Sequence, residues 1–258
     1  GGMEGGLAAA DILVGDACPS GHLTDTFASS FAAYPSSGNF EESPLYVEYQ
    51  EDVFVGYRYF ETIPGAADAV CYPFGFGLSY TTFALSDVSG RLSSDAGELS
   101  ISAKVTNTGA CAGKYVLQAY VNPPKGRMAK PATALVGFAK TRLLEPGESE
   151  TLTIAFAPYG FAAYDDEGVV QKSAYVLEKG EYRFRLGENV RETADVAYRY
   201  ALESNVILAQ LSEKCAPKQL HRRMLADGSY RALSCVPETP RKDWRKLEGI
   251  PDEGQYPL

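Results

Sequence analysis

The chain has 258 residues, of which 45% are hydrophobic and 22% are charged, a composition typical of a globular protein that can bury a sizeable core. Its 33 acidic residues outnumber its 24 Lys and Arg residues, and the net charge of −9 disfavours general binding to nucleic acid because a polyanion is repelled. The sequence shows neither the ~20 consecutive apolar residues of a membrane helix nor a basic start followed by an apolar secretory stretch, so no membrane partner is expected.

Residues 1–80 are rich in glycine and aromatic side chains, and little regular structure is expected there. A short helix is predicted over 7–14, where Ala and Leu favour a helix and Gly15 can end it. The segment from Asp16 to about Leu45 reads as mostly loop. Residues 47–60 have the Val, Tyr and Phe content of a strand, but their spacing also fits one face of a helix, and the two interpretations stay open.

Residues 81–202 give the clearest structural prediction, an antiparallel β-sandwich. Apolar residues alternate with polar ones over 99–105, 152–156 and 182–186, as expected of strands with one buried face. Further strand candidates lie at 115–121, 134–144 and 161–164, and the turn signals between them include Pro146-Gly147. Seven or eight short strands within about 120 residues fit a fibronectin type III or immunoglobulin-like sandwich. Aromatic residues of the preceding segment, notably Phe54, Tyr57, Tyr59, Phe74 and Phe76, are expected to pack on it or on another chain.

Residues 203–258 read as a mostly irregular tail that serves as a linker or a docking segment. Apolar residues such as Val206, Leu211 and Met224 indicate short amphipathic pieces, and five prolines prevent a long helix. Between Lys214 and Lys246 the chain carries nine Lys or Arg and three acidic residues, a local charge of +6. The favoured interpretation is that this basic stretch is a solvated linker that pairs with the chain's own acidic surface. Docking to another domain is the main alternative, and nucleic-acid binding is the least favoured.

One group of carboxylates and one run of glycines are candidates for a functional site. Glu48, Glu51 and Asp52 form a tight carboxylate cluster beside aromatic residues, and glycosidases need two carboxyl groups about 5 to 10 Å apart. The favoured interpretation of this cluster is a solvated face rather than a catalytic pair. The run Gly75-Phe76-Gly77 resembles the start of a dinucleotide-binding loop, but it lacks the third glycine and the following helix, so a nucleotide site is not expected.

Histidine, tryptophan and cysteine add no complete catalytic or metal set. His22 and His221 lie in different segments without a nucleophile motif and are expected to be loop or surface residues. Trp244 could stack on a sugar ring, although an apolar anchor for the tail is favoured. The cysteines lie far apart and are expected to be reduced thiols of a cytoplasmic protein; they are Cys18, Cys71, Cys111, Cys215 and Cys235.

A succession of motifs resembles glycoside hydrolase family 3, the β-glucosidase group. The end of that family's α/β sandwich domain is similar to GMEGG (2–6), AAADIL (8–13), GD (15–16), PSGHL (19–23) and TF (26–27). The link to its fibronectin type III-like domain resembles VGYRYF (55–60) and YPFGFGLSY (72–80). That last domain is similar to VTNTG (105–109), GF (137–138) and LEPGE (144–148). The resemblance implies three regions: the end of the α/β domain (1–80), the fibronectin type III-like sandwich (81–202) and the basic tail (203–258).

The resemblance implies that this chain is the non-catalytic scaffold part of a retaining β-glucosidase that hydrolyses terminal β-glucosides. The family's nucleophilic Asp and acid/base Glu correspond to no position here, and neither Glu51 nor Arg58 inherits a catalytic role, so no catalytic, cofactor or metal residue is assigned. The implied partners are a β-linked glucoside and the remaining domains of the same protein, no cofactor is implied, and a homo-oligomer stays open. We further expect the acid/base Glu to be encoded before Gly1 and the nucleophile, on a (β/α)8 barrel, after Leu258.

Two alternatives remain from the sequence alone. A stand-alone carbohydrate-binding or adhesive β-sandwich module would show aromatic side chains on one sheet face and would bind sugar as an isolated chain. A β-xylosidase of the same family would differ in pocket residues that this chain does not include.

Overall fold

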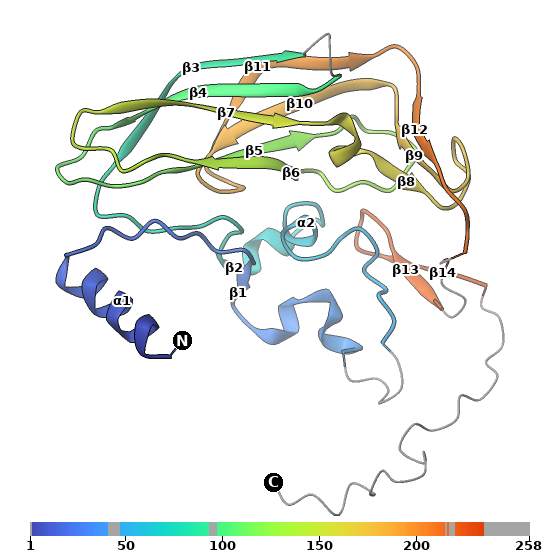
Figure 1. The fold of residues 1–258 in the computed structure, drawn as a ribbon. Coiled ribbons are helices and arrows are strands. Elements are labelled where there is room, and N and C mark those ends of the chain that lie inside the picture. Colours follow the sequence, from blue (N-terminus) through green and yellow to red (C-terminus); the bar gives the residue numbers. More distant parts are fainter. Residues whose placement is uncertain (1, 41–46, 93–96, 215, 217–219, 235–258) are drawn as a thin grey trace, which may run out of the picture.

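The computed structural model describes residues 2–40, 47–92, 97–214, 216 and 220–234. Figure 1 shows a layered β-structure with the N-terminal segment lying along one side of it, so that helix α1 and strands β1 and β2 are on the same side of the sheets. None of the described helices is long and apolar enough to cross a membrane. The fold class is therefore mainly β, as the sequence predicts.

The N-terminal segment contains one long helix and several short elements. Helix α1 spans Gly2–Val14 and ends where Gly15 adopts a positive φ of 87°, which confirms the predicted helix end and extends its start to Gly2. After α1, the described residues up to 40 are mostly loop. They contain only short elements, namely the two-residue strand β1 (Phe27–Ala28) and the 3-10 turns Phe31–Ala33 and Pro35–Gly38. Between 47 and 60 the one regular element is the single-turn helix α2 (Tyr57–Phe60), which decides between the two interpretations of that stretch. The 3-10 turn Ala66–Ala69 then leads into strand β2 (Val70–Tyr72), which pairs with β1.

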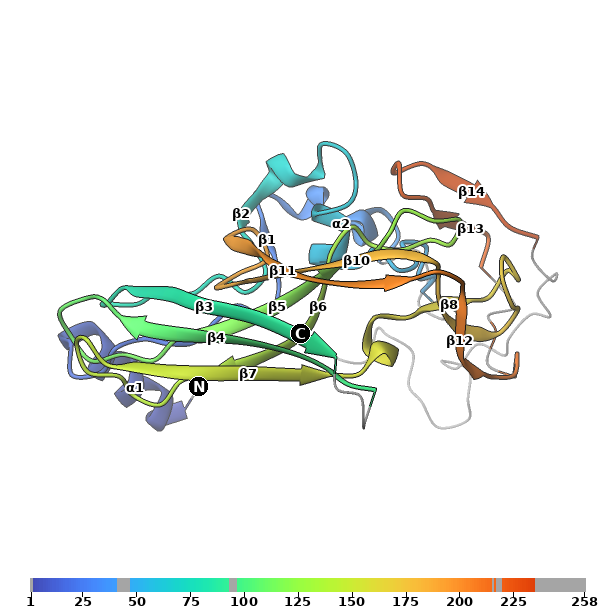
Figure 2. The ribbon, with the colours of Figure 1, turned by 90° about the horizontal axis from the view of Figure 1, so that it is seen from above.

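Two antiparallel sheets form the predicted sandwich (Figure 2). The three-stranded sheet has the order β3-β4-β7, with bounds Phe83–Leu92, Leu99–Asn107 and Ser149–Phe156. The four-stranded sheet has the order β11-β10-β5-β6, with bounds Thr193–Leu202, Gly180–Gly187, Val116–Asn122 and Ala134–Lys140. This topology confirms the antiparallel sandwich.

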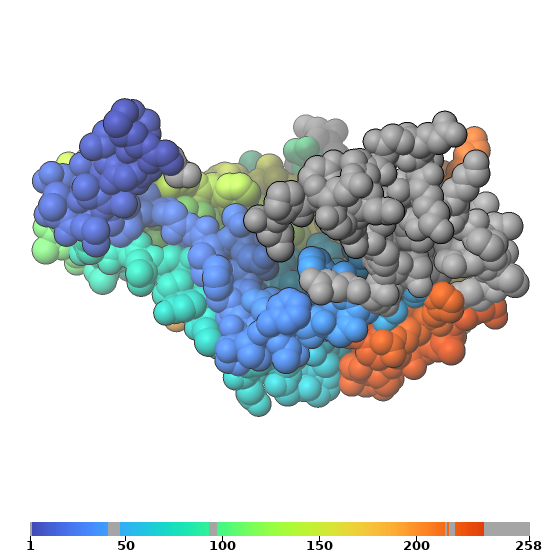
Figure 3. Space-filling view, turned by 90° about the horizontal axis from the view of Figure 1, so that it is seen from below, coloured from blue at the N-terminus to red at the C-terminus, as the bar shows by residue number. Residues whose placement is uncertain are grey.

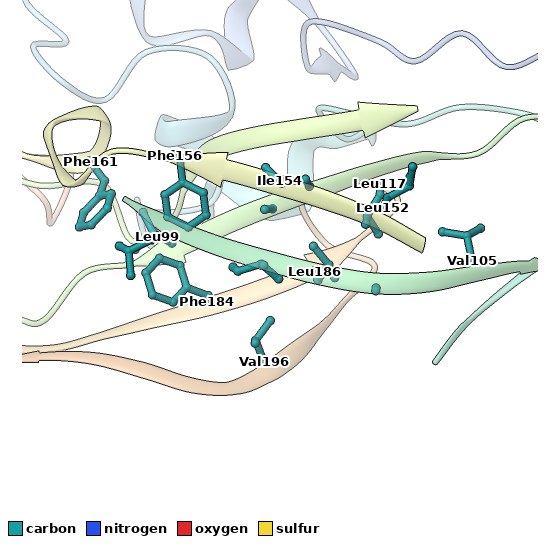
Figure 4. Packing of buried hydrophobic residues seen from close by; sticks show 14 of the residues in the cluster. Leu99, Val105, Leu117, Leu152, Ile154, Phe156, Phe161, Phe184, Leu186 and Val196 are labelled. Atoms are coloured by element: carbon teal, nitrogen blue, oxygen red, sulfur yellow. The ribbon is translucent and has the colours of Figure 1, made fainter. Parts of the chain in front are cut away.

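The sandwich core forms because apolar side chains alternate along the inner strands. Every second residue of β4, from Leu99 to Asn107, is buried, and the central strand β10 points Tyr182, Phe184 and Leu186 into the same core. Figure 4 shows Phe156, Phe161 and Phe184 gathered at one end, with Leu117, Leu152 and Val105 toward the other. The ring centroids of Phe156 and Phe184 are 5.5 Å apart, which is within the range of favourable aromatic contacts.

A third, smaller sheet extends the sandwich at the aromatic end. Its order is β12-β9-β8, with bounds Val206–Gln210, Ala174–Leu177 and Ala163–Asp165, and the 3-10 turn Pro158–Phe161 leads into it. Burial alone raises the pKa of Asp165, but backbone N–H groups of residues 168–171 donate to its carboxylate and hold that pKa below its usual range. Strand β12 shows that the first amphipathic piece predicted in the tail is a paired strand.

The N-terminal segment covers the outer face of the four-stranded sheet. Tyr57 stacks on Phe74 with centroids 4.3 Å apart, and its hydroxyl accepts a hydrogen bond from the backbone N–H of Leu135 in β6 at 2.9 Å. The same ring meets Tyr120 of β5 edge-on, and Tyr120 is fully buried as a result. Tyr57, with Phe74 stacked on it, therefore packs on the sandwich, which is one of the two outcomes the sequence predicted. Phe54 and Tyr59 instead pack in a separate small cluster.

Part of the tail forms a β-hairpin that folds back onto the N-terminal segment. Strands β13 (Arg222–Met224) and β14 (Tyr230–Ala232) pair with each other, and we call residues 221–232 the C-terminal hairpin. Figure 3 shows it beside the N-terminal segment on the face seen from below. Met224 is buried against Phe54 and Ile63, which gives this contact a small apolar core of its own.

Candidate functional site

The carboxylate cluster is enclosed rather than solvated. Glu48 and Glu51 retain only 6% and 9% of their accessible surface, and Asp52 is partly buried. The interpretation of these residues as a solvated face is therefore wrong. The physical reason is the C-terminal hairpin, which lies about 170 residues further along the chain and which local sequence patterns cannot place.

Glu48 is fixed by His221. The backbone N–H of His221 donates to Oε2 of Glu48 at 3.0 Å, and the imidazole Nδ1 of the same residue contacts Oε1. Burial alone would raise the pKa of Glu48, but the hydrogen bonds from His221 hold it below its usual range. Glu48 therefore acts as an ionised anchor, and His221 is a surface histidine, as predicted, with a specific structural partner.

Arg223 connects three parts of the chain. Its guanidinium pairs with Asp52 (Nε to Oδ2, 3.3 Å), with Glu167 (Nη1 to Oε1, 2.9 Å) and with Asp166. Burial raises the pKa of Asp52, and Arg223 opposes that effect. Arg231 adds a second contact to Glu167. These arginines pair with the chain's own acidic surface, as the favoured interpretation of the basic stretch predicts.

Backbone and side-chain hydrogen bonds complete this attachment. The N–H of Met224 donates to the carbonyl of Gln50 at 2.8 Å, and Nε of Arg222 donates to Oε1 of the same glutamine at 2.7 Å. The guanidinium carbon of Arg222 also lies 4.4 Å from the ring centroid of Tyr230, a cation–π distance. The carboxylate cluster therefore works as a docking site for the hairpin: Glu48 and Asp52 are occupied by His221 and Arg223.

The second candidate region lies where the N-terminal segment meets β5. The side-chain amide of Gln118 donates to the carbonyls of Gly75 (3.1 Å) and Glu188 (2.5 Å) and accepts from the hydroxyl of Tyr120 (2.6 Å). His22 donates through Nδ1 to the same Gly75 carbonyl. Gly75 has φ of 81°, and a Cβ there would lie 2.2 Å from Oε1 of Gln118. The Gly75-Phe76-Gly77 run is thus a close packing contact.

Among the described residues, no three His, Cys, Asp or Glu side chains gather as a group that could hold a metal ion. Cys18, Cys71 and Cys111 are free thiols. Cys215, Cys235 and Trp244 lie outside the described residues. Sequence reasoning missed Arg223 and Gln118 as contact residues; the basic stretch signalled the first, and nothing local signalled the second.

The fold and its contacts define a fibronectin type III-like sandwich joined to part of a second domain. Residues 115–190 match the sequence model of the fibronectin type III-like domain, and residues 1–80 match that of the glycosyl hydrolase family 3 C-terminal domain. The chain therefore belongs to glycosyl hydrolase family 3, as its motifs predict.

Similar proteins extend over most of this chain. Beta-glucosidase A of Butyrivibrio fibrisolvens is 52% identical over 90% of the chain, and a beta-glucosidase of Ruminococcus albus is 43% identical over 99%. The crystal structure of a beta-glucosidase from Paenibacillus barengoltzii matches 92% of the chain with a TM-score of 0.79 and 43% identity. The chain spans only 26–30% of the length of these three relatives.

Proposed function

We propose that this chain is the non-catalytic scaffold part of a retaining β-glucosidase that acts on terminal β-glucosides. The observation that carries the proposal is the match to glycosyl hydrolase family 3 together with relatives named β-glucosidases. In such an enzyme one carboxylate attacks the anomeric carbon, and a second protonates the leaving oxygen and then activates water. The two carboxylates that contact the hairpin, Glu48 and Asp52, are poor candidates for these roles because Glu48 accepts a hydrogen bond from the backbone N–H of His221 and Asp52 pairs with Arg223.

The surface of the N-terminal segment supports a scaffold role. Helix α1 has no buried residue, and Met3, Leu7 and Leu13 expose between 57% and 83% of their surface. A shallow apolar hollow lies in the same segment and is lined in part by Phe27, Tyr72 and Phe76. Exposed apolar area of this extent favours contact with another protein surface. The remaining domains of the same protein are the proposed partner.

An activity assay tests this proposal directly. The protein encoded by the complete gene is expected to hydrolyse 4-nitrophenyl β-glucoside faster than the corresponding β-xyloside, and to release β-glucose first as observed by proton NMR. The 258-residue chain alone is expected to give no turnover above background, because catalytic groups that act as a unit are absent together. Turnover by this chain that survives repurification and disappears in Glu51→Gln would contradict the scaffold assignment. A larger rate on the β-xyloside would contradict the substrate assignment alone.

A further inference from the structure

A cavity of about 300 Å³ lies between the N-terminal segment and the edge of the sandwich. One wall comes from residues 20–22 and 77–83, and the other from residues 114–115, just before β5, and from the β10–β11 connection. We call it the junction cavity and define it by Ser79, Thr82, Phe83, Lys114, Tyr115 and Glu188. Cavities at the meeting of two domains are preferred positions for small ligands, and this volume is at the lower end of their range.

Hydrogen bonds on both sides hold the walls of the junction cavity in place. Gln118 ties the carbonyl of Gly75 to that of Glu188, so the two sides are joined through one buried amide. The hydroxyl of Thr81, next to Thr82, donates to Oδ1 of Asn107 at 2.7 Å in a buried bond. The N–H of Tyr115 donates to the hydroxyl of Thr141 at 2.9 Å. The cavity is therefore preformed, and little ordering is needed before a ligand enters.

The lining of the junction cavity suits a neutral ligand with many hydroxyl groups. Ser79, Thr82 and Tyr115 line the cavity with hydroxyl-bearing side chains. The hydroxyls of Ser79 and Thr82 already contact Cys18 and Thr108, and each hydroxyl can take part in a further hydrogen bond. Burial, reinforced by the neighbouring Glu192, raises the pKa of Glu188 to about 7, so the Glu188 carboxyl carries less negative charge at neutral pH than an ordinary glutamate. Lys114 lines the same cavity as Glu188, so the lining does not carry charge of one sign only.

An aromatic wall adds a place for the apolar face of a sugar ring. Phe83 and Tyr115 have ring centroids 5.2 Å apart, and both line the cavity. The C–H face of a pyranose ring packs on aromatic carbon while its hydroxyls bind polar groups around the rim. The volume of about 300 Å³ is sufficient for one such ring.

We propose that the junction cavity binds a single neutral pyranose, with D-glucose as the representative ligand. The choice of glucose rests on the proposed function, because glucose is the product of β-glucoside hydrolysis. Bound at this position, the sugar contacts the N-terminal segment and the sandwich together and so stabilises their junction.

The test is a titration of the 258-residue chain with D-glucose, followed by amide NMR, with the acyclic polyol sorbitol as the matched ligand control. Glucose is expected to shift signals of residues 79–83 and 114–115, and sorbitol is not. Tyr115→Phe keeps the ring contact with Phe83 and removes one hydroxyl, so glucose binding should weaken about threefold to tenfold. Tyr164→Phe removes an exposed hydroxyl from β8 and should leave the affinity unchanged.

Three results would overturn the proposal: no shift at these residues with glucose, equal shifts with sorbitol, or equal affinity in Tyr115→Phe and the unmodified chain. Because the titration measures binding without turnover, its failure is separate from that of the proposed function. If the complete protein hydrolyses β-glucosides and this chain does not bind glucose, only the junction-cavity proposal fails.

Discussion

The sandwich and the C-terminal hairpin differ in the kind of contact that holds them. The sandwich has an apolar core in which Leu117, Ala103 and Phe184 are fully buried. The hairpin buries mainly Met224 and is otherwise attached by polar contacts. These are hydrogen bonds to Glu48 and Gln50 and the ion pairs of the largely buried Arg223. The apolar contribution to stability scales with the buried area, which is large in the sandwich and small at the hairpin, whereas a single polar contact contributes only about 1 kcal/mol net. The molecule therefore combines a strongly held body with an attached hairpin that can open separately.

Truncation of the sandwich core should give the largest effect. Phe184→Ala removes a ring that contacts Phe156, Phe161 and Tyr198, and it should lower the free energy of unfolding by about 3–5 kcal/mol. Urea denaturation followed by fluorescence measures the change. Phe138→Ala, on an exposed side chain of β6, is the control and should change stability by less than about 0.5 kcal/mol. Equal losses in the two variants would contradict the core described here.

A buried ion pair tests whether charge can matter as much as apolar packing. Glu178 and Lys130 are 2.6 Å apart with less than a tenth of each side chain exposed, and the N–H of Arg127 also donates to Glu178. Glu178→Ala leaves a buried ammonium unpaired and should cost about 3–5 kcal/mol in urea denaturation. The exposed pair of Glu181 and Arg183 provides the control, because Glu181→Ala should cost about 1 kcal/mol or less. A Glu178→Ala variant as stable as Glu181→Ala would show that the pair is not buried in solution.

The strand pattern of the sandwich could be predicted because it depends on neighbouring residues. Leu99, Ile101 and Val105 face the core in β4 because side chains alternate along any strand. Strands β3 and β11 were harder to recognise, since β3 is mostly exposed and a register shift interrupts its pairing between Ser86 and Ser89. Both strands lie at sheet edges, where one-sided burial leaves a weaker pattern.

The contacts of the candidate site could not be predicted in the same way. The sequence places Glu48, Glu51 and Asp52 together, but their burial depends on His221 and Arg223, which are about 170 residues away. No helical or strand periodicity records such a contact. The excess of basic residues in the tail predicted pairing with acidic residues, and only the structure identifies the partners.

A substitution at the junction between the N-terminal segment and β5 should have an effect of intermediate size on stability. Gly75→Ala introduces both an unfavourable positive φ and a contact with Gln118, whereas Gly147→Ala has a similar φ of 82° and open space around it. Backbone strain alone costs about 1–3 kcal/mol, and Gly75→Ala should exceed Gly147→Ala by roughly 1 kcal/mol or more in thermal and urea unfolding. Equal costs would show that the approach of Gly75 to Gln118 is not close in solution.

The hairpin should open locally when Arg223 is replaced. Arg223→Met keeps an apolar stem and removes the contacts to Asp52, Asp166 and Glu167. We expect amide exchange in residues 221–232 to accelerate roughly tenfold, while the exchange of β4 and β10 is unchanged. Arg183→Met, on an exposed pair of β10, is the matched control. Acceleration throughout the sandwich would show that the hairpin belongs to the cooperative unit.

Lowering the pH should produce the smallest effect, an acceleration of amide exchange that is confined to the hairpin. The pKa of Glu48 is lower in the folded chain than in the unfolded one, so its contribution to stability is present above the unfolded value, about 4.3, and is lost as the pH falls through the folded value. Exchange of the amide of His221 should therefore accelerate, beyond the intrinsic pH effect, only below about pH 4. The variant Glu48→Gln should remove this step. A step that persists in Glu48→Gln would assign it to another carboxylate.

The long sequence separation of the hairpin contacts has a consequence for folding during synthesis. A ribosome releases Glu48 and Asp52 well before it makes His221 and Arg223, which lie 173 and 171 residues later. The sandwich strands emerge in that interval and can pair with one another before the hairpin has been made. The carboxylates of Glu48 and Asp52 therefore remain exposed to water until almost the whole of this chain has been synthesised. Attachment of the hairpin is then the last step in the assembly of these residues, and release of a shorter nascent chain would leave the carboxylate cluster uncovered.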